Sequence, residues 1–142
     1  MTAYSSFGTL LQVDDGGGVS FTTIAHVRDI TGPAMTTDVE DVTSHSSAGG
    51  FEEIIPTLKH AGEVTFDVLF DPNDATHDGS TGLVSLQNSR AKRSFRMIMP
   101  TSPAKRWNFQ GYITSVSVAA PVAGVQTASV TIRISGQPTI SS

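Results

Sequence analysis

The chain of 142 residues contains no cysteine, so neither a disulfide nor a reactive thiolate contributes to its fold or chemistry. No segment approaches the roughly 18 apolar residues that a membrane-spanning helix needs, and we predict no membrane partner. Residues 1–8 lack the basic and apolar regions of a secretory signal, so synthesis in a cytoplasm is expected. Hydrophobic residues make up 38% of the chain, enough for one packed domain spanning residues 1–142.

Acidic residues are missing from the second part of the chain. Residues 1–80 carry thirteen negative charges against two positive ones, a net of −11, whereas residues 81–142 carry seven positive charges only. Three explanations are open: the two parts interleave in the fold, the basic part binds nucleic acid, or acidic and basic surfaces meet between copies. Because the whole chain is acidic and has few aromatic residues, we favour a solvated or subunit-contact role for the clustered bases, which are Arg90, Lys92, Arg93, Arg96, Lys105 and Arg106.

Alternating apolar and polar residues predict a mainly β protein. In residues 63–70, Val64, Phe66, Val68 and Phe70 occupy every second position, as in a strand with one buried face. Other strands are predicted at residues 9–13, 21–30, 95–99, 107–119 and 128–134. The glycines of residues 14–18 predict a tight turn between the first two of these strands, and Gly111 predicts a bulge or bend in the longest.

Three segments lack this alternation. Leu83 and Leu86, preceded by Ser80 and Thr81 as candidate caps, predict one short helix over residues 82–92 with basic residues in its last turns. Residues 35–56 and 71–79 are polar and aperiodic, which predicts loops. A loop as long as residues 35–56 is usually functional in a compact domain.

No catalytic or metal site is predicted, and no cofactor. The four histidines, His26, His45, His60 and His77, do not have the spacing of zinc ligands. No nucleophile elbow surrounds the hydroxyl residues beside His45. Residues 74–79 partly match a calcium loop, but the position of its bidentate glutamate is occupied by Ser85. We therefore expect a protein that is not an enzyme.

Several segments, taken in order along the chain, resemble one family. These are Ile30–Pro33, Asp38–His45, Phe51–Gly62 leading into Phe70–Pro72, Phe109–Thr114, Ala120–Pro121 and Ile134–Thr139. Together they are similar to the major tail tube proteins of siphophages, the long-tailed bacteriophages. The resemblance implies a β-sandwich or split barrel with one flanking helix, which assembles, six copies to a ring, into a barrel around a lumen.

The resemblance also implies a function and partners. Stacked rings would form the tail tube of a virion, assembled in the host cytoplasm, through which double-stranded DNA and the tape measure protein pass without sequence-specific binding. Tail tip and terminator proteins would bind its ends. The loop at residues 35–56 would reach a neighbouring ring through Phe51, Glu52, Glu53, Ile54 and Ile55. Glu63, Asp67 and Asp71 would form an acidic lumen wall, and residues 1–8 and 137–142 would be flexible tails.

Alternatives stay open at this stage. The apolar residues of the loop could fold back onto their own domain, and the polar face that includes Glu63 could meet bulk water. Another ring-forming protein, such as a type VI secretion tube or tail-completion protein, would have a similar pattern. A carbohydrate-binding β-sandwich is less favoured, since few aromatic residues are available for a sugar-binding face.

Overall fold

The computed structural model describes residues 3–16 and 19–142 and is mainly β, with 48% strand and 7% helix. Eight antiparallel strands form one sheet in the order β2-β1-β7-β8-β9-β6-β3, with β10 also paired to β8, while β4 and β5 form a separate pair. The strands are β1 (Leu10–Asp14), β2 (Phe21–Thr23), β3 (Val27–Thr31), β4 (Thr36–Asp41), β5 (Ile54–His60), β6 (Glu63–Leu69), β7 (Arg93–Met99), β8 (Lys105–Ala119), β9 (Thr127–Ile134) and β10 (Thr139–Ser141); the helix α1 is Leu83–Ser89.

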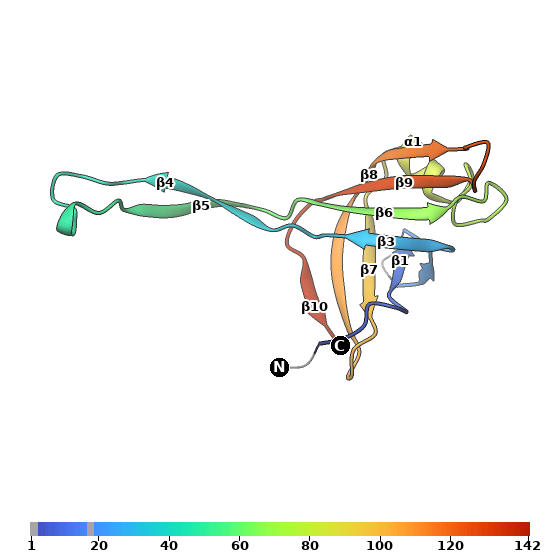
Figure 1. Ribbon diagram of the computed structural model, residues 1–142, viewed down its shortest axis with the longest axis horizontal. Coiled ribbons are helices and arrows are strands. Elements are labelled where there is room, and N and C mark those ends of the chain that lie inside the picture. The colour runs from blue at the N-terminus through green and yellow to red at the C-terminus, as the bar shows by residue number, and fades with distance from the viewer. Residues whose placement is uncertain (1–2, 17–18) are drawn as a thin grey trace.

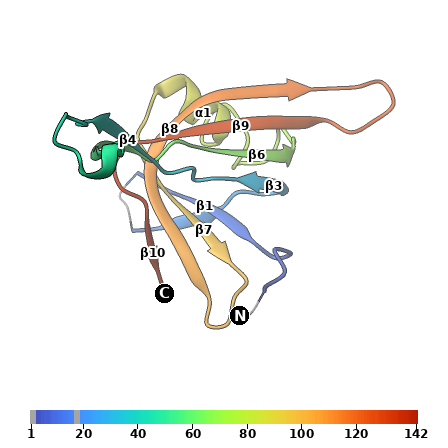
Figure 2. The same ribbon diagram turned by 60° about the vertical axis from the view of Figure 1, so that its left-hand side comes forward.

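The large sheet folds over on itself along β8. Residues 105–111 of β8 pair with β7, whereas residues 111–119 pair with β9. Figures 1 and 2 show the two halves turned across each other, with β7 running steeply to β6 and β9. The predicted β-sandwich or split barrel is therefore confirmed.

The core lies between these two halves. Val64, Phe66 and Val68 of β6 are at most 1% exposed, as the alternation predicted. Ala128, Val130 and Ile132 of β9 pack beside them, since β6 and β9 pair residue by residue. The other half contributes Leu11, Phe95, Met97 and Phe109, and α1 adds Leu83 and Leu86.

Local corrections concern breaks in strands. Residues 21–30 form two strands, because the chain turns between them and His26 takes a positive φ of 59°. The hairpin between β1 and β2 is confirmed, although Gly17 and Gly18 of its turn lie outside the described residues. The bulge predicted at Gly111 lies instead between Ile113 and Ser115. A Cβ at Gly111 would lie 2.3 Å from the Arg133 carbonyl oxygen, so this glycine allows β8 to approach β9 closely.

The helix is shorter than predicted. It begins after Gly82, which makes no side-chain cap, so the predicted caps Ser80 and Thr81 were wrong. The carboxylate of Asp78 accepts hydrogen bonds from the backbone N–H groups of Ser80, Thr81 and Gly82. No basic residue lies in the last turn of this helix, since Arg90 already leaves it in the left-handed conformation.

Two further predictions are corrected. Residues 35–56 are not an aperiodic loop: they contain β4, a short 3-10 turn and the start of β5. Residues 137–142 are not a free tail, because Thr139–Ser141 pairs with β8 as β10. Residues 71–79 form an irregular loop as predicted, and His77 fixes it to the body. His77 is fully buried; it donates from Nε2 to the Ala25 carbonyl and accepts at Nδ1 from the Asp71 N–H.

Candidate assembly surfaces

The most prominent surface is a two-stranded arm, defined here as residues 35–60. Figure 1 shows β4 and β5 extending from one end of the sheet, well clear of the body. The arm continues the β3–β6 pair, since β3 leads into β4 and β5 leads into β6. Every residue of β4 and β5 is exposed, so burial supplies no alternating pattern there. This exposure explains why the sequence predicted a loop.

Two glycines form the root of the arm. Gly32 and Gly62 both have positive φ, 110° and 75°, in the two segments that connect the arm to the body. A Cβ at Gly62 would lie 2.5 Å from the Ala34 carbonyl oxygen, and one at Gly32 would lie 2.4 Å from the Glu63 carbonyl oxygen. The opposing backbones therefore approach more closely here than any side chain allows. The root fixes the direction of the arm through backbone contact.

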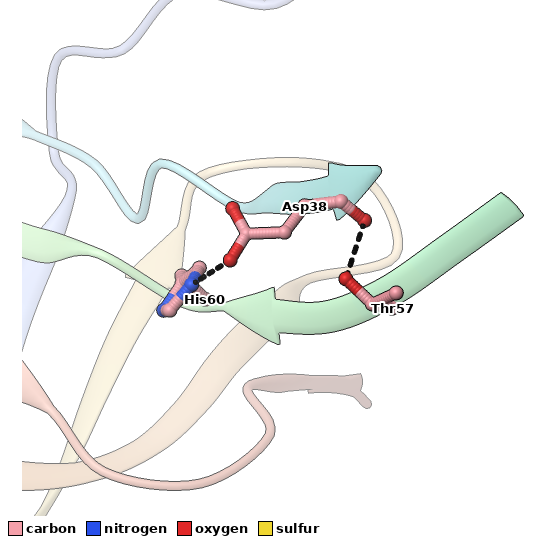
Figure 3. A network of polar contacts seen from close by, with 3 residues as sticks. All are labelled: Asp38, Thr57 and His60. Carbon is pink, nitrogen blue, oxygen red and sulfur yellow. Dashed lines mark hydrogen bonds and ion pairs between the residues drawn. The ribbon is translucent and has the colours of Figure 1, made fainter. Parts of the chain in front are cut away.

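Polar contacts hold the two arm strands together where their register is irregular. Figure 3 shows Asp38, Thr57 and His60 at this point. A carboxylate oxygen of Asp38 lies 2.9 Å from His60 Nε2, and the Thr57 hydroxyl donates to the Asp38 carbonyl oxygen at 3.2 Å. The register shift between Thr37 and Val39 places Asp38 in this position. His60 is therefore a structural residue of the arm.

The tip of the arm is held by hydrogen bonds and exposes several apolar side chains. The Glu53 N–H donates to the Thr43 hydroxyl at 2.7 Å, and the Val42 N–H donates to the Glu53 carbonyl. Hydrogen bonds from the hydroxyl and then the N–H of Thr43 lower the pKa of Asp41. Phe51 is 76% exposed and Ile54 52% exposed. The predicted contact residues Phe51 to Ile55 do lie together at the outer part of the arm, and they do not fold back onto the body.

The second surface is the outer face of β3, β6, β9 and the second part of β8. Paired residues share a face, and here they form rows of hydroxyl side chains such as Thr65, Thr131 and Ser115. Glu63 lies in the next row and its carboxylate is 3.6 Å from the Arg133 guanidinium. Asp67 faces the same way, opposite Ser129. Asp71 lies beyond the end of β6, so only two of the three predicted lumen residues share this face.

This four-stranded part has two open edges. In the residues that the structure describes, β3 pairs with β6 alone, and residues 112–119 of β8 pair with β9 alone. Such edges present unpaired backbone N–H and C=O groups and readily pair with another chain. The two edges lie on opposite sides of the sheet, so one copy can offer its β8 edge to the β3 edge of another.

The predicted basic residues do not form one cluster. The Arg96 guanidinium stacks over the Phe21 ring at 3.6 Å, whereas Lys105 and Arg106 donate to Ser142. Arg90 ends α1, and Lys92 and Arg93 follow it before β7. Arg96 and Arg106 nevertheless share one face of β7 and β8, because Arg96 pairs with Asn108 and Arg106 with Ile98.

Metal and membrane interpretations find no support in the structure. Among residues 3–16 and 19–142, no group of three potential metal ligands is found. No described helix has the length and apolarity to cross a membrane.

Comparisons with known proteins agree with this geometry. Residues 5–141 match the family model described as "Lambda phage tail tube protein, TTP". No curated protein sequence matches the chain significantly. Among solved structures, the chain is similar to the tail of an empty GTA particle refined with C6 symmetry, with a TM-score of 0.77, 22% identity, and coverage of 99% of this chain and 100% of that one.

Two other structures share the fold. The sheath/tube terminator of an extracellular contractile injection system has a TM-score of 0.73 at 12% identity, covering 100% of this chain and 99% of that one. The SPP1 tail tube has a TM-score of 0.64 at 12% identity, covering 93% and 74%. At these identities the likenesses establish the fold, while the family match extends over nearly the whole chain.

Proposed function

From the premise that this chain belongs to the lambda phage tail tube protein family, a family of structural virion proteins, we propose how its surfaces build a tube. The protein is a structural component of the tail of a virion. The proposal concerns the ring, the stack and the lumen. The observation that carries it is the four-stranded part of the sheet, which has an open edge on each side and an arm beyond one end.

Within a ring, the β8 edge of one copy pairs with the β3 edge of the next. Closing a sheet in this way removes its open edges, which otherwise promote aggregation. The similar GTA tail has C6 symmetry, and six copies of this chain would close an analogous ring. The edge residues involved are those of β3, including Arg28, and residues 112–119 of β8.

The outer face of the four-stranded part lines the lumen. Its other face is covered by α1 and by the second half of the sheet. Only the hydroxyl-rich face is therefore accessible to line the lumen. Arg133 is neutralised there by Glu63, which leaves Asp67 as a net negative charge. Passing DNA is itself densely negative, so this wall would not retain it. The tape measure protein would fill the same lumen before ejection.

Between rings, the arm contacts a neighbouring copy. It extends along the strand direction beyond the end of the sheet, whereas partners within the ring lie beside the sheet edges. The exposed apolar residues at its outer part, Phe51, Ile54 and Ile55, supply the area that such a contact would bury. Tail tip and terminator proteins would bind the free arms at one end of the tube and the free arm-binding surfaces at the other.

Electron microscopy of the concentrated full-length protein tests this function. Hollow tubes of stacked rings are expected, and a protein that stays monomeric and binds a glycan would refute it. Deleting residues 46–53 should leave rings that do not stack. Val122→Ser, a substitution of another exposed apolar residue that lies outside the arm, is the control and should still form tubes. Tubes of normal length from the deletion variant would exclude a stacking role for the arm.

The lumen assignment has its own test. Replacing Glu63 and Asp67 with lysine should leave tubes intact but make their inner wall basic, so that DNA is retained. Infectivity of phage complemented with this variant should fall, while tail length in micrographs stays unchanged. Undiminished infectivity would place this face outside the DNA path.

A further inference from the structure

The net charge of the chain is located entirely in the arm. Residues 35–60 contain five acids against one base, a net of −4, which equals the net charge of the whole chain. The remaining residues contain eight acids and eight bases, a net of zero. A division of the chain at residue 80 does not reveal this location of the charge, because β1, β3 and β6 from the acidic part interleave with β7, β8 and β9 from the basic part in one sheet. Arms of different copies therefore repel one another, and each is attracted to basic surface on a body.

One face of the body combines arginines with the apolar residues Leu10, which is exposed, and Ile98, which is half-buried. We define the arginine face by the outward residues of β1, β7 and β8, which are Leu10, Gln12, Arg96, Ile98, Arg106 and Asn108. The strand register places them side by side: Leu10 pairs with Ile98, Gln12 with Arg96, and Ile98 with Arg106. The opposite side of the same strands is the core side, with Leu11, Met97 and Phe109 buried. Leu10 is 42% exposed although it is apolar.

The arginine face carries no free carboxylate on its strands. Asp14 of β1 also points outward, but it is buried and accepts a hydrogen bond from the Ser94 N–H. Arg96 and Arg106 are diagonal neighbours, about 7–8 Å apart at their backbones. A shallow hollow of about 300 Å³ lies next to them, bordered by Phe21, Arg96 and Thr139. The face is therefore basic, partly apolar and indented.

The outer part of the arm presents the matching pattern. Glu40 pairs with Ile55 across β4 and β5, and Asp41 pairs with Ile54, so each side of the arm shows a carboxylate next to an isoleucine. On the arginine face, Arg106 pairs with Ile98 in the same manner. Charged pairs of opposite sign steer partners together and fix their register, while the apolar residues supply buried area.

We propose that the arm of one copy binds the arginine face of a second copy through the side that carries Glu40 and Ile55, with Glu40 next to Arg106 and Ile55 against Ile98 and Leu10. The arm points away from its own body, so the face that receives it belongs to another molecule (Figure 1). The two surfaces differ, which makes the contact head-to-tail and able to continue through a stack. The inference rests on the proposed function and identifies the surface that receives the arm.

Disulfide trapping tests this contact, because the natural chain has no cysteine to interfere. Full-length Ile55→Cys protein is mixed with Ile98→Cys protein, assembled, oxidised and run on a non-reducing gel. A covalent heterodimer is expected. Asn88→Cys, at an exposed position of α1 that belongs to none of the proposed contacts, replaces Ile98→Cys in the control and should give no dimer with Ile55→Cys.

The outcomes separate the two proposals. If tubes form without an Ile55–Ile98 cross-link, or if Ile55→Cys cross-links equally with Asn88→Cys, the arginine face is not the surface that receives the arm, and the tube function still stands. A natural chain that stays monomeric and binds a glycan overturns the tube function and this inference together.

Charge reversal provides a second measurement. Arg106→Glu should weaken each contact about two- to five-fold, as for an exposed ion pair, and the loss should be greatest at low salt. The measurement is the fraction of protein that sediments as tubes. Adding Glu40→Arg to the Arg106→Glu chain should restore this fraction. Lys92→Glu changes the net charge equally but lies off the arginine face, so it should assemble normally. A double variant no better than Arg106→Glu alone would contradict the pairing.

Discussion

Gly62→Ala tests whether the root of the arm controls assembly. Gly62 has a φ of 75°, a conformation that costs a residue with a side chain about 1–2 kcal/mol. A Cβ there would also lie 2.5 Å from the Ala34 carbonyl oxygen, whereas real Cβ contacts are no shorter than 3.0 Å. The opposing backbone must therefore move by at least 0.5 Å.

The displacement is amplified along the arm. Neighbouring strands are about 4.8 Å apart, so a shift of 0.5 Å at the root turns the arm by roughly 6°. Phe51 lies eleven residues further along, roughly 36 Å at about 3.3 Å per residue. The tip would then move by about 4 Å, which is as large as the heavy-atom separation at which two apolar side chains are still in contact. Assembly should fail although the body, which contains the core, stays folded.

Gly50→Ala is the matched control. Gly50 has a φ of 73°, so its backbone cost is the same, but nothing lies within 4 Å of the added Cβ. Circular dichroism and thermal unfolding should show both variants folded, and electron microscopy should show tubes for Gly50→Ala only. Tubes of equal number and length from both variants would refute the lever-arm reasoning.

Four other substitutions address the stability of the core, the arm tip and the loop at residues 71–79. Phe66→Ala, in the core, should lower the free energy of unfolding by about 3–5 kcal/mol, whereas Phe51→Ala at the exposed tip should change it by less than about 0.5 kcal/mol; urea titrations of the two variants compare them. His77→Ala should cost roughly 1–3 kcal/mol in the same assay, because it leaves the Asp71 N–H and Ala25 carbonyl without partners. Hydrogen bonds, foremost from the Thr76 hydroxyl, lower the pKa of Asp74. The ionised Asp74 should therefore stabilise the fold fully above its ordinary pKa of 3.8, and this contribution should be lost as the pH falls below that value. An Asp74→Asn variant should accordingly lose less stability than the natural chain between pH 5 and pH 2.

Strands with one buried face were predictable from the sequence. Val64 to Val68 and Ala128 to Ile132 alternate because the core takes one side of β6 and β9 and solvent takes the other. The same physics explains the failure at the arm. Both sides of β4 and β5 are exposed, so no selection for apolar residues at alternate positions marks them as strands.

Other features depended on contacts distant in sequence. The helix cap was misplaced because Asp78, and not Ser80 or Thr81, accepts the N–H groups before α1. The strand β10 has three residues and forms only through its pairing with β8. Phe51, Ile54 and Ile55 were identified correctly as exposed apolar residues. The arginine face, in contrast, could be recognised only from the register of three strands.

The charge of the arm gives any stack of this protein a direction. A head-to-tail contact engages every arm except those of the terminal ring, which stay free at one end, while the opposite end keeps its receiving faces unoccupied. Each free arm carries a net charge of −4. If the arms bind the arginine faces as proposed, a protein that closes the arm end would present basic surface, and one that starts or closes the other end would present acidic surface with apolar anchors. The two ends of the tube would be chemically distinct, and growth at each would respond differently to salt.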